Sequence, residues 1–149
     1  MRLSLLAAAT VAVAWGVTAS AATVRCPASA IGTTTLKGTR SADVITGCAG
    51  PDEIRGYGGD DDLQGRGGND FIFGGAGKDV LSGGNGNDKL DGDSGADTLR
   101  GGRGLDVIDA RDSSVDRVVC GAGRDLVEAD RHDKVARDCE QVQRTGGRP

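Results

Sequence analysis

A nine-residue period in glycine, aspartate and a large aliphatic residue dominates the chain. When a glycine is set at position 1, aspartate recurs at position 6 and isoleucine or leucine at position 8. Eight such copies follow one another without a gap from Gly38 to Asp109, and the copy from Gly74 to Ser82 is among the clearest. A period of this length indicates a stack of small repeated units, since one unit cannot bury its apolar face alone.

The register slips by one residue after the eighth copy. Asp116 lies ten residues after Asp106, and the spacing of nine returns at Asp125. A last partial copy contains Asp133 and Val135. The repeats therefore end less regularly than they run through the middle of the chain.

Each nonapeptide divides into a glycine-rich turn and a strand of three residues centred on the aliphatic position. Glycine at positions 1 and 4 permits the positive φ angles that a sharp turn requires. Because neighbouring side chains of a strand point to opposite faces, the aliphatic side chain points inward and its two neighbours face solvent. The predicted core is Ile45, Ile54, Leu63, Ile72, Leu81, Leu90, Leu99 and Ile108, continued by Val118 and Val127.

One large apolar side chain in every nine residues makes a thin core. Burial of an aliphatic side chain contributes ~1.5–3 kcal/mol, whereas ordering the backbone costs ~1–2 kcal/mol for each residue. Burial alone therefore does not hold such a fold together, and a second source of stability is needed.

The repeat resembles that of the RTX (repeats-in-toxin) family, which reads G-G-x-G-x-D-x-U-x with U a large aliphatic residue. The resemblance extends from Gly38 to Glu128. With an N-terminal signal sequence and cysteine pairs at its ends, the chain is also similar to the small calcium-binding proteins that some bacteria secrete. The resemblance implies an all-β fold, a parallel β-roll (right-handed β-solenoid) in which two repeats form each turn.

In such a roll, alternate aspartates would stack on the same edge. Stacked carboxylates would lie about 4.8 Å apart, the spacing of paired strands, and would repel one another unless a cation lay between them. Calcium suits this position because it takes about six to eight oxygen ligands, which carboxylates of two turns and loop carbonyl groups can supply. Magnesium demands stricter octahedral geometry, and zinc would find only Cys48 within the eight contiguous repeats. The predicted columns are Asp43, Asp61, Asp79 and Asp97 on one edge, and Asp52, Asp70, Asp88 and Asp106 on the other.

The first and last loops follow the repeat less closely than the inner ones. Ser41 replaces the position-4 glycine before Asp43, and the loop before Asp52 contains a proline. Asp116 lies at the register slip.

A lone aspartate in a glycine-rich turn would form an Asx turn without a metal, whereas columns in phase favour several calcium ions. We expect the chain to be largely disordered without calcium and to fold on binding it. The best predicted ligands are Asp61, Asp70, Asp79, Asp88, Asp97 and Asp106.

The N-terminus has the pattern of a secretory signal peptide. Met1-Arg2 is a short basic region, residues 3–17 are mostly apolar, and Ala19-Ser20-Ala21 is a small-x-small cleavage pattern. We predict cleavage before Ala22 and a secreted, extracellular protein, because the apolar run is short for a membrane anchor. The predicted organisation is a signal peptide (1–21), an N-terminal cap (22–37), the repeats (38–128), a C-terminal cap (129–143) and a disordered tail (144–149).

The charge balance excludes one large class of partner. Removal of the signal peptide takes away one arginine and no acid, which leaves 18 − 1 = 17 basic and 22 acidic residues, a net charge of −5. Nucleic-acid binding requires a basic stripe, so we expect no nucleic-acid partner.

Four cysteines in a secreted chain suggest two disulfides, for which three connectivities are possible. Local pairing of Cys26 with Cys48 and of Cys120 with Cys139 would close each end of the solenoid, where core and strand edges are otherwise exposed. A zinc site is the alternative, but the chain has no C-x-x-C motif.

No catalytic motif is present, so we predict that the protein is not an enzyme. His132 is the only histidine, and the chain lacks H-E-x-x-H, G-x-S-x-G and a phosphate-binding loop. A calcium-binding module that acts as a monomer is the first interpretation. A calcium-dependent adhesin with a cell-surface or polysaccharide partner is the second, because Phe71 and Phe73 should both point outward, although they are equally consistent with incidental sheet surface.

Overall fold

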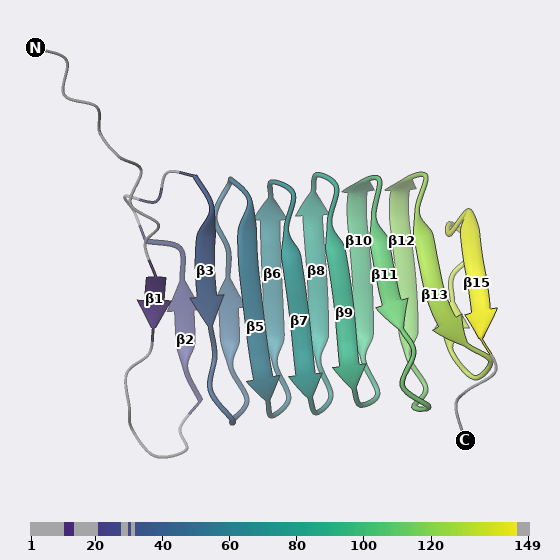
Figure 1. The fold of residues 1–149 in the computed structure, drawn as a ribbon, viewed down its shortest axis with the longest axis horizontal. Helices are drawn as coiled ribbons and strands as arrows, with labels where there is room; N and C mark the ends of the chain where they lie inside the picture. Colours follow the sequence, from purple (N-terminus) through teal and green to yellow (C-terminus); the bar gives the residue numbers. More distant parts are fainter. Residues whose placement is uncertain (1–10, 14–20, 28–29, 31, 146–149) are drawn as a thin grey trace, which may run out of the picture.

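The computed structural model of the protein describes residues 11–13, 21–27, 30 and 32–145. These residues form strands, turns and bends and contain no helix. Two parallel sheets lie back to back as a β-solenoid of about seven turns, and Figure 1 shows the strands following one another along its length. The predicted all-β parallel β-roll is confirmed.

The odd-numbered strands form one sheet and the even-numbered strands form the other. The odd sheet contains β1 (Val11–Val13), β3 (Thr34–Lys37), β5 (Asp52–Gly58), β7 (Phe71–Ala76), β9 (Lys89–Ser94), β11 (Val107–Ala110), β13 (Leu126–Asp130) and β15 (Gln141–Thr145). The even sheet contains β2 (Thr23–Arg25), β4 (Val44–Thr46), β6 (Asp62–Gly67), β8 (Val80–Asn85), β10 (Thr98–Gly104), β12 (Arg117–Gly123) and β14 (Lys134–Val135).

Strand register confirms that two nonapeptides make one turn. Ile54 pairs with Ile72, and Ile72 pairs with Leu90, so each residue lies beside its equivalent two repeats away. The register slip shifts two pairings by a single residue, that of Leu99 with Val118 and that of Ile108 with Val127. A bend after β11 absorbs the extra residue, where Ser113 has a φ of +97°.

Most strands of the repeats are longer than the three residues expected around each aliphatic position, although β4 has three. β6 and β8 each contain six residues and continue through positions 1 to 3 of the following repeat. Gly67, for example, pairs with Asn85 of the next turn. Glycine-rich segments therefore extend the strands of the inner repeats, because the stacked repeat offers an equivalent backbone with which to pair.

The expected conformation of the glycines is correct at position 4 and wrong at position 1. Positive φ angles occur at positions 2 and 4, for example +113° at Gly75 and +139° at Gly77. Gly74, at position 1, lies outside this region of φ. Glycine is needed there for space: a Cβ atom on Gly74 would lie 2.5 Å from Asp79 Oδ2 and 2.8 Å from the Gly92 carbonyl oxygen.

The aliphatic residues of successive repeats form the core between the two sheets. All ten predicted core residues, from Ile45 to Val127, have no exposed surface. Leu36 extends this core toward the N-terminal end. Phe71 points outward and is 52% exposed, and Phe73 is half-buried, as their places beside Ile72 predicted.

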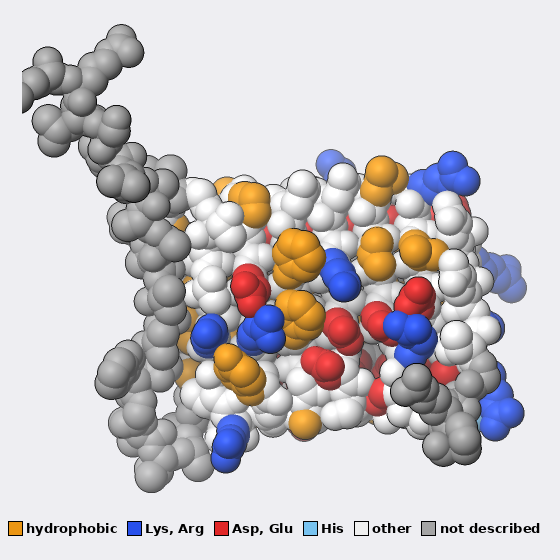
Figure 2. All heavy atoms as spheres, in the orientation of Figure 1, with side chains coloured by type: hydrophobic (Ala, Val, Ile, Leu, Met, Phe, Trp, Pro, Cys, Tyr) orange, Lys and Arg blue, Asp and Glu red, His pale blue; other side chains and the backbone are white. Residues whose placement is uncertain are grey.

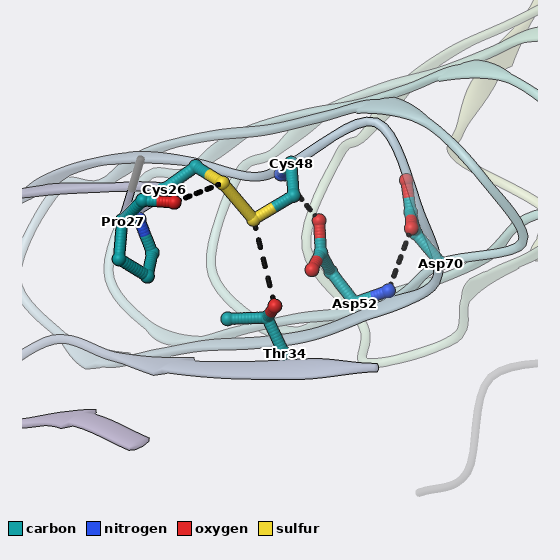
Figure 3. The surroundings of a disulfide bond; sticks show 6 residues. All are labelled: Cys26, Pro27, Thr34, Cys48, Asp52 and Asp70. Carbon is teal, nitrogen blue, oxygen red and sulfur yellow. Dashed lines mark hydrogen bonds between the residues drawn. A yellow bond between two sulfur atoms is a disulfide. The ribbon is translucent and has the colours of Figure 1, made fainter. Parts of the chain in front are cut away.

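Disulfides join Cys26 to Cys48 and Cys120 to Cys139, which confirms the predicted local pairing. Figure 3 shows the first of them beside Thr34 and Asp52. Arg144 and Thr145 belong to β15, so the predicted disordered tail is wrong for these two residues; residues 146–149 lie outside the described part of the chain. Most of the predicted signal peptide also lies outside it, apart from Ala21 and β1, which pairs with β3.

Candidate metal sites

Two columns of buried aspartates run along the edges of the solenoid, one on each edge. Every aspartate at position 6 of a repeat, from Asp43 to Asp125, comes just before a strand or at its start, and is at most 2% exposed. Each predicted ligand therefore lies in the column that a turn of two repeats predicts. The first Asp column contains Asp43, Asp61, Asp79, Asp97, Asp116 and Asp133, and the second contains Asp52, Asp70, Asp88, Asp106 and Asp125.

A ladder of hydrogen bonds links the members of each column. The backbone N–H of Asp61 donates to Asp79 Oδ1 at 2.8 Å, and the Asp79 N–H donates to Asp97 Oδ1 at the same distance. Figure 3 shows the equivalent bond of the second column, from Asp52 to Asp70, at 2.9 Å. Oδ1 of each inner aspartate thus accepts the backbone N–H of the preceding turn, which leaves Oδ2 for a different partner.

That second oxygen has no partner in the inner loops. Within the described part of the chain, it is buried and accepts no hydrogen bond in seven aspartates. A buried acceptor without a partner costs about 1–3 kcal/mol, and more when it is charged. A row of such oxygens is therefore a candidate binding site for cations. The seven atoms are the Oδ2 atoms of Asp61, Asp70, Asp79, Asp88, Asp97, Asp106 and Asp125.

The two N-terminal loops differ from this arrangement. The Thr39 N–H donates to Asp43 Oδ2 at 2.5 Å, and the Cys48 N–H donates to Asp52 Oδ2 at 2.5 Å. Thr39 and Cys48 stand at position 2, where Tyr57 of the next repeat has a φ of +79°. The two kinds of loop therefore differ in backbone conformation at position 2. In the first two loops the position-2 N–H donates to Oδ2 of the aspartate, whereas in the inner loops Oδ2 has no partner.

The columns resist ionisation when no cation is present. Burial, with a smaller contribution from neighbouring carboxylates, raises the pKa of Asp61, Asp70 and Asp97 to about 7, from an ordinary value of 3.8. Burial raises the pKa of Asp116 to about 7 and that of Asp106 to about 6. A cation beside these groups would reverse the effect, because it stabilises the ionised form.

Carboxylates alone do not complete a metal site. Among the described residues, no three Asp, Glu, His or Cys side chains gather closely enough to hold an ion. An ion held by these carboxylates would need main-chain carbonyl groups of the loops as its remaining ligands. These loops stack closely, since a Cβ atom on Gly95 would overlap the Gly77 carbonyl oxygen. An all-oxygen donor set of this kind fits calcium. All four cysteines are in disulfides, so zinc has no thiolate ligand.

Asp125 is the one residue of the unpartnered set that was missing from the predicted ligands. The Asp106 N–H donates to Asp125 Oδ1 at 2.9 Å, so Asp125 continues the second column. The nine-residue spacing from Asp116 was the available signal, but the register slip made the loop look irregular. Asp116 itself keeps its place in the first column, where its Oδ1 accepts the Asp97 N–H at 2.8 Å.

A parallel β-solenoid with two columns of buried, unsatisfied carboxylates is a calcium-binding repeat structure. The chain belongs to the RTX calcium-binding nonapeptide repeat family, whose sequence profile matches four times, over residues 31–61, 55–90, 73–108 and 91–127. No curated protein and no solved structure gave a significant match to the chain. The described residues include no helix of the length and apolarity that a membrane span requires.

Proposed function

We propose that the protein is secreted and folds only when calcium occupies its two Asp columns. The unpartnered Oδ2 atoms of the inner loops carry this proposal. At about 1–3 kcal/mol each, seven such atoms together rival the roughly 5–15 kcal/mol that stabilises a whole domain. Several calcium ions would remove this cost and neutralise the repulsion along each column. The six inner aspartates and Asp125 are the main proposed ligands; Asp52 keeps one unpartnered oxygen and Asp43 keeps none.

Secretion has two lines of support. The N-terminal sequence has the basic, apolar and small-residue regions of a signal peptide. Disulfides persist in oxidising compartments, and this chain places one at each end of the solenoid. We therefore propose cleavage before Ala22 and release of an extracellular monomer that performs no catalysis.

Circular dichroism of the oxidised, processed protein tests the folding proposal. The strand signal should be weak in EGTA and should appear in millimolar calcium. Asp79→Asn should weaken calcium binding by at least about tenfold, because it removes charge from an unpartnered buried carboxylate. Asp62→Asn is the matched control, since Asp62 precedes the buried Leu63, points outward and should bind calcium normally. A strand signal unchanged by EGTA would contradict calcium-coupled folding.

The outer face of the odd sheet favours a second function, calcium-dependent adhesion to a glycan. A hollow there is lined by Tyr57, Phe73, Arg55, Asp93 and Arg111, among others. Tyr57 is 47% exposed, and the Arg55 guanidinium lies 4.6 Å from the centre of the Phe73 ring. Figure 2 shows hydrophobic side chains beside acidic and basic ones across the middle of one face. Such a mixture of aromatic faces and charged hydrogen-bonding groups is suited to sugars.

A pull-down against cell-envelope polysaccharide, with and without calcium, tests adhesion. Binding should require calcium and should fall at least about fivefold in Tyr57→Ala, since loss of an aromatic contact costs on the order of 1 kcal/mol. Val44→Ala, which changes an exposed apolar residue of the even sheet, should bind like the wild type. Absence of calcium-dependent binding to any polysaccharide would leave calcium binding as the sole function.

A further inference from the structure

The first Asp column does not end at Asp43 but continues to the backbone of Ala22. The Ala22 N–H donates to Asp43 Oδ1 at 2.5 Å, as the Asp43 N–H donates to Asp61 Oδ1 at 2.7 Å. The Ala22 carbonyl accepts the Val44 N–H at 2.9 Å, as the Asp43 carbonyl accepts the Asp62 N–H at 2.8 Å. The backbone of Ala22 therefore occupies the position that an aspartate backbone occupies in every later turn.

The hydrogen bonds that Asp43 accepts also differ from those of the inner aspartates. Its Oδ2 accepts the Thr39 N–H at 2.5 Å, and its Oδ1 accepts the Thr39 hydroxyl at 3.2 Å in addition to the Ala22 N–H. Asp43 is 2% exposed, and none of the ion pairs in the described part of the chain involves it. It is a buried carboxylate with both oxygens hydrogen-bonded and no opposite charge from a side chain.

We propose that Asp43 binds the α-ammonium group of the mature N-terminus at Ala22 and is not a calcium ligand. Hydrolysis of the Ala21–Ala22 peptide bond by a signal peptidase consumes one water molecule. It leaves a carboxylate on Ala21 and an ammonium on Ala22, so the hydrogen bond to Asp43 becomes a buried ion pair. This inference rests on the cleavage included in the proposed function.

The surroundings of the bond suit this processing. Ala21 is exposed and Ala22 is half-buried, so the cleaved bond lies at the surface, just before β2. β2 begins at Thr23 and pairs with β4, as in Val24 with Ile45, so cleavage leaves the strand that holds Ala22 intact. A charged donor makes a hydrogen bond about twice as strong as a neutral one. The first column would thus begin with a fixed positive charge supplied by the chain itself.

A stability comparison tests the ion pair. The intact mass of the protein secreted from the full chain is measured first, to establish that it begins at Ala22. It is then compared with a form that retains Ala21, with both disulfides formed and calcium saturating, by urea unfolding. The form that begins at Ala22 should have a folding equilibrium constant ~10-fold larger, since a charge-assisted bond replaces a neutral one. Asp43→Asn should abolish the difference, whereas the control Asp88→Asn, in the second column, should destabilise both forms and preserve it.

Different failures lead to different conclusions. A secreted protein that begins elsewhere would overturn the processing step and with it this part of the proposed function. Equal stability of the two forms, with the N-terminus at Ala22, would overturn the ion pair alone. If Asp43→Asn fails to fold, labelling of the wild type with an amine-reactive ester decides: the Ala22 amine should react at least about tenfold more slowly than the α-amine of the form that retains Ala21. Equal reactivity would contradict the pairing.

Discussion

At the scale of single residues, the glycine positions of the repeat differ in their φ angles and in the space that they leave for a Cβ atom. Position 4 combines positive φ with close stacking, as at Gly77, where a Cβ atom would overlap the Gly59 carbonyl oxygen. Position 1 lacks only the space for a Cβ atom. Position 2 has positive φ from the third repeat onward and is also closely stacked, since a Cβ atom on Gly75 would overlap the Tyr57 carbonyl oxygen; even so, Tyr57, Arg66 and Asp93 adopt this conformation with a side chain. Each of them bears a conformational cost of about 1–2 kcal/mol that glycine would avoid.

The space around each glycine predicts different effects on stability for a Gly→Ala change at position 1 and one at position 3. Gly74→Ala should destabilise the calcium-bound protein by roughly 1–3 kcal/mol, because its Cβ atom would press on Asp79 Oδ2 and on the Gly92 backbone. Gly58→Ala should change stability by less than about 1 kcal/mol, since the nearest atom would be 3.7 Å from its Cβ atom and Ala76 occupies the equivalent position two repeats later. Urea unfolding in saturating calcium measures both, and equal losses would contradict the assignment of position 1.

At the scale of strands and loops, the sequence predicted what depends on period and could not predict what depends on stacking. The inward aliphatic residues follow from the nine-residue period, whereas the pairing of alternate repeats and the two aspartate columns follow from the resemblance to the RTX family. The strand lengths do not, because glycine has no strand preference of its own and pairs only where an identical backbone lies beside it. The positive φ angle at position 2 could not be predicted from the sequence either, because it depends on the stacking of neighbouring turns.

The register slip shows the same limit within one loop. The inserted residue is visible between Asp106 and Asp116, and it suggested a distorted site. In the fold, the bend after β11 takes up the extra residue: Asp112 accepts the Ser114 N–H at 2.6 Å and the Gly95 N–H at 2.7 Å. The ladder therefore passes through Asp116 unbroken. Sequence alone locates such an insertion but does not reveal which side chains absorb it.

At the scale of the whole molecule, protons and calcium compete for the two columns. Burial raises the pKa of Asp61, Asp70, Asp97 and Asp116 to about 7, well above the ordinary value of 3.8. Between these two values the calcium-free fold binds more protons than the unfolded chain. Its stability therefore falls as pH rises through this window and is greatest below it, so acid partly substitutes for calcium.

Calcium binding should show the opposite dependence on pH. The ion requires ionised carboxylates, so it must displace protons at pH 5 but few of them above the raised pKa values near 7. Affinity should therefore rise steeply from pH 5 to about pH 7 and level off above it, with net proton release at the lower pH. Isothermal titration in buffers of different ionisation enthalpy measures the released protons. Asp62→Asn, on the outer surface, should leave this dependence unchanged, whereas Asp97→Asn should reduce the number of protons released. A calcium affinity independent of pH between 5 and 7 would show that the columns are already ionised without calcium and that burial does not control them.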